Sequence, residues 1–238
     1  MRHISEKEYA HELLGDKFAH GLSMYDTQRR MDILIDEFLP ESAVKGKRVL
    51  EVGAGYGFFS ERLQQRGAIV TATDIGEGLL AQVKERVGCE CIQADALSLE
   101  ESFGRNSFDT VLSSECVEHT PSPGEALRQM AKVLRPGGWL SVSTPNLIWQ
   151  PVVRLATFAG ARPFDGLENF STFRGMRQAL APESVQVVRQ KGLHLFPFQL
   201  PLHSLSRWCD RRLQVFRSLM INLCVLGRKT AAFEVKAD

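Results

Sequence analysis

A glycine-rich turn near residue 55 is the segment of this sequence with the clearest chemical signature. It reads Val49-Leu50-Glu51-Val52-Gly53-Ala54-Gly55-Tyr56-Gly57. Glycines at this spacing permit a tight turn and let a ligand come close to the backbone. The dinucleotide fingerprint G-x-G-x-x-G would need its third glycine at Phe58, one residue after Gly57. Glu51 stands two residues before the first glycine, where a carboxylate repels a pyrophosphate and favours a cationic ligand.

Two further carboxylates follow the next predicted strands. Asp74 comes directly after residues 68–73, and Asp95 comes directly after residues 90–94. A carboxylate after the second strand can accept hydrogen bonds from both ribose hydroxyls of a nucleoside. An acidic side chain after the third strand can accept from an exocyclic amine. Each residue alone is also typical of a turn or a helix cap, but three carboxylates at successive strand ends predict an acidic, nucleoside-shaped site.

The order of predicted elements would bring these side chains to one edge of a sheet. Strands are predicted at 47–52, 68–73, 90–94, 108–113 and 139–143, with helices at 58–66, 78–87 and 123–134. This alternation indicates βαβ units and a parallel sheet, whose ligands bind outside the carboxyl ends of the strands. Later in the chain we expect helices at 182–190 and 204–216 and strands at 193–198 and 219–226. The predicted fold is α/β: a Rossmann-like, seven-stranded, mostly parallel sheet with helices on both faces and an antiparallel edge strand.

These motifs resemble those of the class I S-adenosylmethionine-dependent methyltransferases. Residues 49–57 are similar to the first motif of that family, E/D-x-G-x-G-x-G, and Asp74 matches its ribose-binding acidic position. Residues 94–96, 108–121 and 134–138 resemble its later motifs, so the likeness covers about residues 45–146 in order and spacing. Residues 144–146, Thr-Pro-Asn, are similar to the ubiquinone-type O-methyltransferase branch, although the same feature occurs in enzymes that act on sugars and lipids.

The resemblance implies S-adenosyl-L-methionine as the cofactor and assigns roles by position. The glycine turn would approach the methionine moiety, with Glu51 near its ammonium group, and Asp74 would hold the ribose. Asp95 and its neighbours would hold the adenine, and residues 114–119 would lie beside the sulfonium. The implied cofactor-binding residues are Glu51, Gly53, Ala54, Gly55, Gly57, Asp74, Ile75, Asp95, Ala96, Leu97, Ser114 and Glu115. Tyr25 and Arg29 are further candidates, as a cover over the cofactor or a grip on its carboxylate.

A methyl transfer of this kind needs alignment of the acceptor for in-line displacement and exclusion of water. If the acceptor is a hydroxyl, a general base with a pKa near neutrality assists. His119, in the loop after the predicted fourth strand, is the catalytic candidate. The alternatives are Glu118 or Glu115 as the base, with His119 only ordering the loop. No His or Cys spacing indicates a metal site, and none is expected.

The acceptor is expected to be a small molecule. An aromatic, a sugar and a lipid-linked compound all remain open, and O-methylation is preferred over N- or C-methylation. Contact with a membrane surface through residues 147–162 is an alternative to a lid over the site. Two other classes stay in competition: a nicotinamide-dependent oxidoreductase and a non-catalytic subunit with a methyltransferase-like fold. The aromatic residues expected to line the acceptor pocket are Trp149, Phe158, Phe164, Phe170, Phe173 and Phe196.

Composition sets the remaining limits. The chain has 238 residues, 44% hydrophobic and 24% charged, which is typical of a globular protein. We expect one methyltransferase domain over 1–238, with a helical cap at 1–45, a cofactor-binding core at 46–146 and an acceptor-side cap with the last strands at 147–238. A net charge of +1 argues against a nucleic-acid partner. Five cysteines without a secretion signal favour reduced thiols and a cytoplasmic location, and oligomeric state is left open.

Overall fold

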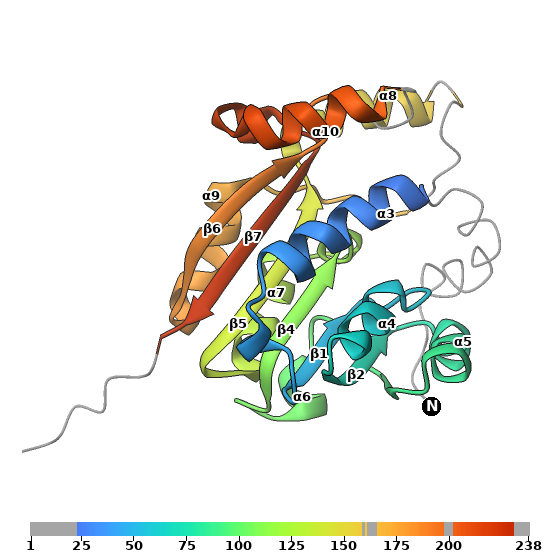
Figure 1. Ribbon diagram of the computed structural model, residues 1–238, viewed down its shortest axis with the longest axis vertical. Helices are drawn as coiled ribbons and strands as arrows, with labels where there is room; N and C mark the ends of the chain where they lie inside the picture. Colours follow the sequence, from blue (N-terminus) through green and yellow to red (C-terminus); the bar gives the residue numbers. More distant parts are fainter. Residues whose placement is uncertain (1–22, 159, 161–165, 198–201, 231–238) are drawn as a thin grey trace, which may run out of the picture.

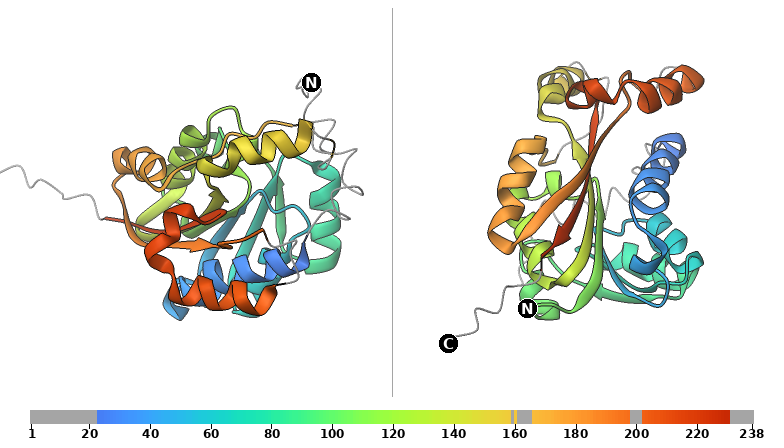
Figure 2. Two further views of the ribbon diagram at one scale, coloured as in Figure 1. Left: turned by 90° about the horizontal axis from the view of Figure 1, so that it is seen from above. Right: turned by 60° about the vertical axis from the view of Figure 1, so that its left-hand side comes forward.

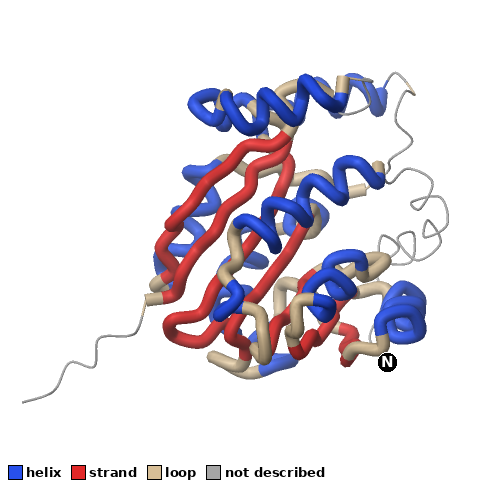
Figure 3. The backbone as a smooth tube through the Cα atoms, viewed as in Figure 1, coloured by secondary structure: helices blue, strands red, loops and turns tan. Residues whose placement is uncertain are grey.

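The computed structural model describes residues 23–158, 160, 166–197 and 202–230, which fold around a seven-stranded sheet (Figures 1 and 3). The strand order is β3-β2-β1-β4-β5-β7-β6. The strands are β1 (Arg48–Val52), β2 (Ile69–Asp74), β3 (Glu90–Gln93), β4 (Phe108–Ser114), β5 (Leu134–Pro145), β6 (Val185–Leu193) and β7 (Asn222–Lys229).

Pairing within the sheet is parallel from β3 through β5, and β7 runs antiparallel to both β5 and β6. The predicted fold class is therefore confirmed: the sheet has seven strands, is mostly parallel and has antiparallel pairing at one edge. Because β1 to β5 share one direction, their carboxyl ends meet at one edge of the sheet. That edge carries the turns and loops from which a site can be built.

Helices cover both faces of the sheet (Figure 2). One face is covered by α3 (Met24–Met31), a π-helical segment η1 (Asp32–Glu37), α4 (Phe58–Gln65) and α5 (Glu77–Val87). The other is covered by α6 (Leu99–Phe103), α7 (Pro123–Val133) and α9 (Phe173–Leu180). The remaining elements are α8 (Gln150–Phe158), α10 (His203–Arg212) and the 3₁₀ turns η2 (Glu41–Ala43), η3 (Val117–His119), η4 (Leu147–Trp149), η5 (Ala181–Glu183) and η6 (Gln214–Leu219). Among the helices described here, none has the length and apolar character to cross a bilayer.

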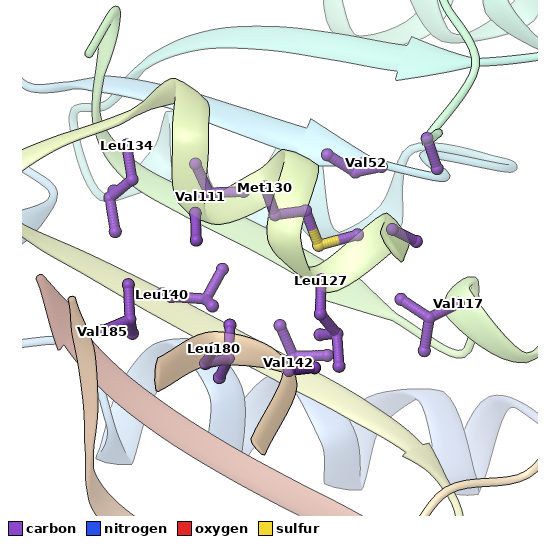
Figure 4. Close-up of a cluster of buried hydrophobic side chains, with 14 of the residues drawn as sticks. Val52, Val111, Val117, Leu127, Met130, Leu134, Leu140, Val142, Leu180 and Val185 are labelled. Carbon is purple, nitrogen blue, oxygen red and sulfur yellow. The ribbon is translucent and has the colours of Figure 1, made fainter. Parts of the chain in front are cut away.

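Two apolar cores, one on each face, hold these layers together. Leu127 and Met130 of α7 point into the first, toward Leu140 and Val142 of β5 (Figure 4). The second core packs the π-helical segment, α4 and α5 against the opposite face. A fully buried leucine contributes roughly 1.5–3 kcal/mol relative to an exposed one, so these layers hold the sheet edge in place.

The expectations for the last third of the chain were partly wrong. The helix predicted at 182–190 is a 3₁₀ turn followed by strand β6. The strand predicted at 193–198 shares only Leu193 with β6, and residue 198 lies outside the described residues. Val185 and Val188 are three residues apart, which resembles a helical stripe. However, the register of β6 against β7 shifts between Val187 and Arg189, and this irregularity breaks the two-residue alternation of a strand. The last strand starts at Asn222 rather than 219, and helices α6 and α9 were not anticipated.

Candidate functional site

The glycine turn between β1 and α4 has two glycines that the structure explains. Gly53 has φ of 75°, and a Cβ atom there would lie 2.5 Å from the Sγ atom of Cys116. Any side chain at this position would therefore collide with the loop after β4. Gly55 has φ of 50° and no heavy atom within 4 Å of its would-be Cβ, so its outer side is open to a ligand.

Asp74, at the end of β2, holds the glycine turn. Its Oδ2 atom accepts a hydrogen bond from the backbone N–H of Gly55 at 2.9 Å, and its Oδ1 atom accepts from Gly76 at 3.0 Å. The carbonyl of Thr73 accepts from the N–H groups of Gly53 and Ala54. The side chain of Asp74 is half-buried. Sequence spacing had placed this carboxylate near the turn, and the structure brings the two into direct contact.

The end of β3 adds the second acidic position. The N–H of Ala94 donates to the carbonyl of Asp74 at 3.2 Å, which fixes the segment after β3 beside that of β2. The Oδ1 atom of Asp95 accepts from the N–H of Leu97 at 2.9 Å. Ala96 is buried in the core, and Ile75 is half-buried, with its carbonyl accepting from Gln93. The candidates after β1, β2 and β3 therefore lie on one edge of the sheet.

Glu51 has a different environment from the one expected. Its carboxyl group is buried and bonded to the hydroxyl of Ser60, on α4. Burial, with the nearby charge of Asp74, raises the pKa of Glu51 to about 8. The side chain is therefore mostly neutral at pH 7 and joins β1 to α4 beneath the glycine turn.

The raised pKa of Glu51 predicts that folding stability falls as pH rises. In an unfolded chain glutamate titrates near pH ~4.3, whereas folded Glu51 keeps its proton up to about pH 8. Its stabilising contribution is complete below the unfolded pKa and is lost as pH rises through the folded pKa. The Glu51→Gln variant lacks the titrating group. Its urea-unfolding midpoint should therefore fall less steeply with pH, between the unfolded pKa and the folded pKa of Glu51, than that of the parent protein.

The matched control for this prediction is Glu41→Gln. Glu41 is exposed and its pKa is lowered by Lys45, so its titration lies below the window. The control should keep the slope of the parent protein. A Glu51→Gln slope equal to that of the parent would contradict the assignment of the buried proton to Glu51.

Side chains from the ends of β4 and β5 and from the start of β7 form a hydrogen-bonded network with Glu115 on the same edge. The Oγ atoms of Ser114 and Ser143 lie 3.0 Å apart, and Ser143 donates to Oε1 of Glu115 at 2.8 Å. Asn222 of β7 donates to Oε2 of Glu115 at 2.8 Å. Glu115 has φ of 52°, an uncommon value for a residue with a side chain, and Ser143 and Asn222 hold its carboxyl group in place. Burial and the nearby Glu118 raise the pKa of Glu115 to about 8.

A buried network of charged side chains on α3 bonds to Ser114, and the sequence analysis did not predict it. Nη1 of Arg30 donates to Ser114 at 2.6 Å, and its Nε donates to Asp26 at 3.0 Å. The other Asp26 oxygen lies 2.9 Å from Nε2 of His194, a fully buried ring. Burial raises the pKa of Asp26, but Arg30 and His194 outweigh it and lower the pKa below its usual value. The four-residue spacing of Asp26 and Arg30 on a helix was the available signal.

His119 lies in the 3₁₀ turn after β4. Its Nδ1 atom is 3.0 Å from the carbonyl oxygen of Leu167, and because a carbonyl only accepts, the neutral ring carries its proton there. Nε2 is then the acceptor nitrogen, and it lies 3.9 Å from Oε1 of Glu118. Glu118 is buried, which raises the pKa of its carboxyl to about 8. The geometry provides an ordered ring with one basic nitrogen.

The remaining candidates lie on α3 and in the segments after β5. Tyr25 stacks on His203 at a centroid distance of 4.0 Å, and Arg29 pairs with Asp210, so both contact α10. Phe173 is part of the α7 core while Phe158 is 91% exposed, so the expected aromatic residues do not share one enclosed pocket. Phe164 and residues 1–22 of the predicted cap lie outside the described residues. In the described ranges, no three His, Cys, Asp or Glu side chains form a group that could hold a metal ion.

Comparison with known proteins gives this geometry a family context. A family model described as a methyltransferase domain matches residues 50–142. The ubiquinone biosynthesis O-methyltransferase of Pseudomonas fluorescens (strain Pf0-1) is 41% identical over 106 residues, which are 42% of this chain and 45% of that protein. The chain spans about half the length of the curated relatives it matches.

Two solved structures share the fold. An S-adenosylmethionine-dependent methyltransferase from Mesorhizobium loti aligns with a TM-score of 0.63 at 20% identity, covering 83% of this chain and 97% of the other. The magnesium protoporphyrin IX methyltransferase of Synechocystis PCC 6803, with bound SAH, aligns with a TM-score of 0.62 at 14% identity, covering 86% and 84%. At these identities the likeness is one of fold.

Proposed function

We propose that this chain, whose residues 50–142 match a methyltransferase domain, transfers a methyl group from S-adenosylmethionine to a hydroxyl oxygen of a small-molecule acceptor. The observation that carries the proposal is the meeting of three strand ends at one edge. The glycine turn, Asp74 and Asp95 lie there together with the loop after β4. The O-methyltransferase names of the relatives favour a hydroxyl acceptor.

The chemistry of this edge fits S-adenosylmethionine. The open side of Gly55 permits close approach of the methionine part, and the half-buried carboxylates of Asp74 and Asp95 can accept from ribose hydroxyls and the adenine amine. Ile75, Ala96 and Leu97 would provide apolar contacts beside them. Ser114 and Glu115, from the end of β4, would close the opposite side. Glu51, bonded to Ser60, would support the turn from below.

The cofactor supplies an activated methyl group, and the chain must position the acceptor and take its proton. Nε2 of His119 is the nitrogen suited to accept that proton, because Nδ1 is engaged by Leu167. The Glu118 backbone carbonyl accepts from the N–H of Asn169, so the segment just before α9 packs beside the 3₁₀ turn and orders it. In this proposal His119 acts as the general base, and Glu118 helps to order the turn that carries it.

Calorimetric titration of the purified chain with S-adenosylmethionine, S-adenosylhomocysteine and NAD tests the cofactor assignment. We expect heat of binding with the first two ligands and none with NAD, because Glu51 and the position of Gly57 depart from the dinucleotide fingerprint. Binding should be followed by a screen of phenols, sugars and lipids for methyl transfer. Binding of the cofactor with no turnover in any arm would favour a non-catalytic binding subunit, and binding of NAD alone would overturn the proposal.

Asp74→Asn should weaken S-adenosylmethionine binding by roughly tenfold to a hundredfold. The amide keeps the shape of the side chain, but it loses the charge and turns one of the two oxygens that accept from Gly55 and Gly76 into a donor. A hydrogen bond to a charged group contributes about 1.5–3 kcal/mol. Asp109→Asn is the matched control, because Asp109 lies at the opposite edge and bonds to Arg48 and Arg135. Equal cofactor affinity in both variants would remove Asp74 from the ribose site.

A further inference from the structure

Exposed apolar side chains are concentrated on one surface beyond the carboxyl ends of the strands. We call it the carboxyl-end surface: residues 147–158, which form η4 and α8, and residues 202–219, which include α10 and η6. Figures 1 and 2 show these helices together at the same end of the molecule. Eleven of the fourteen large apolar side chains that are exposed in the described residues belong to it: Leu147, Ile148, Val152, Leu155, Phe158, Leu202, Leu205, Trp208, Val215, Phe216 and Leu219.

The two segments of this surface form a continuous support. Nε1 of Trp149 donates to the carbonyl of Leu219 at 2.9 Å, and Nδ2 of Asn146 donates to the carbonyl of Ser218 at 2.8 Å. These bonds join the start of the first segment to the end of the second. The apolar side chains are therefore held on one scaffold rather than on two independent arms.

The charged residues of this surface are mostly positive. Its two segments contain five arginines: Arg154, Arg207, Arg211, Arg212 and Arg217. Their only acidic residue is Asp210, which is 2% exposed and bonded to Arg29 and to the N–H of His194. The whole chain carries a net charge of only +1, so the surface is a cationic region on a nearly neutral protein.

We propose that the carboxyl-end surface binds flat on an anionic lipid bilayer. Apolar side chains interleaved with arginines are the composition of helices that lie in the membrane interface. A second copy of the chain would fit poorly, because a two-fold contact through this surface would bring the arginines of both copies together. Anionic headgroups instead match the arginines, while the apolar side chains enter the acyl boundary. This inference goes beyond methyl transfer, and binding to vesicles can be measured without a methyl-transfer assay.

Vesicle sedimentation with the full chain tests the proposal. Vesicles of phosphatidylglycerol mixed with phosphatidylcholine should bind the protein, and vesicles of phosphatidylcholine alone should bind it much more weakly. Raising the salt concentration should weaken binding to the anionic vesicles, because screening reduces attraction at the surface. Absence of binding to the anionic vesicles at low salt would overturn the proposal, whatever the chain does with S-adenosylmethionine.

Matched variants locate the binding surface. Phe158→Glu should weaken vesicle binding by at least about tenfold, since it removes an apolar ring and adds a negative charge. Ile69→Glu is its control, because Ile69 is 61% exposed at the opposite end of the sheet. Arg211→Gln with Arg212→Gln should weaken binding about fivefold for each arginine, whereas Lys45→Gln with Lys47→Gln should not. Equal losses in variants and controls would overturn the proposal.

Size-exclusion chromatography tests whether a second copy of the chain, rather than a bilayer, covers this surface. A parent chain that forms a dimer, becomes monomeric with Phe158→Glu and ignores vesicles would show that the surface is an interface between copies. A parent chain whose vesicle binding is lost with Phe158→Glu, and whose oligomeric state is unchanged by it, supports the bilayer. Circular dichroism of each variant checks that folding is retained.

Discussion

Replacing Arg30 with methionine should lower the free energy of unfolding by about 3–5 kcal/mol, the cost of removing one partner from a buried ion pair. Arg30 is 6% exposed and bonds to Asp26 and Ser114. Without the guanidinium of Arg30, the hydrogen-bonding neighbour that this network leaves to the buried Asp26 carboxylate is His194. Urea unfolding followed by circular dichroism measures the change.

The control is Arg135→Met, which breaks a partly exposed pair with Asp109 and should cost about 0–1 kcal/mol. Adding Asp26→Asn to Arg30→Met should recover part of the loss, because the second change removes the uncompensated charge. If Arg30→Met costs no more than Arg135→Met, the network does not hold α3 onto the sheet edge.

Removing His119 should have the largest effect on turnover. His119→Ala should lower kcat by about 100-fold or more, the usual contribution of a general base, and leave the affinity for S-adenosylmethionine nearly unchanged. The assay is formation of S-adenosylhomocysteine with the best acceptor found by screening. His203→Ala is the matched control, because His203 is exposed at the start of α10 and stacks on Tyr25.

A second substitution separates catalysis from ordering. His119→Asn offers an N–H group that can reach toward the Leu167 carbonyl, but it has no nitrogen able to take up a proton near neutral pH. If His119 is the base, the His119→Asn variant should be as inactive as the His119→Ala variant. The rate of the residual reaction should then no longer fall at low pH, where a general base becomes protonated. If Asn restores activity, His119 only orders the turn, and Glu118 or Glu115 becomes the candidate base.

The core of the fold was predictable because its signals are local. The strands β1 to β5 contain β-rich runs; β1 is followed by Gly53, β2 ends at Asp74 and β5 ends at Pro145. The expected positions of Asp74 and Asp95 follow from parallel pairing of these strands. The glycine turn could be predicted from the spacing of its glycines, and its hydrogen bond to Asp74 agrees with the predicted closeness of the two.

The rest depended on contacts between distant segments. His194 and Asp26 are 168 residues apart in sequence, and only folding brings them within hydrogen-bonding distance. The burial of Glu51 against Ser60 likewise depends on how α4 packs, so its raised pKa could not be inferred from a position beside a turn. Edge strand β6 was misassigned because its register shift hides the alternation on which strand prediction relies.

The contact between Gly53 and Cys116 links the two proposed ligands. Gly53 belongs to the turn that would receive the cofactor, and Cys116 belongs to the loop that would face the acceptor. A shift of that loop on acceptor binding would press on the turn or release it, so we expect the two affinities to be coupled. Thermodynamic linkage then requires reciprocity: an acceptor that tightens cofactor binding by some factor is itself bound more tightly, by the same factor, when the cofactor is present.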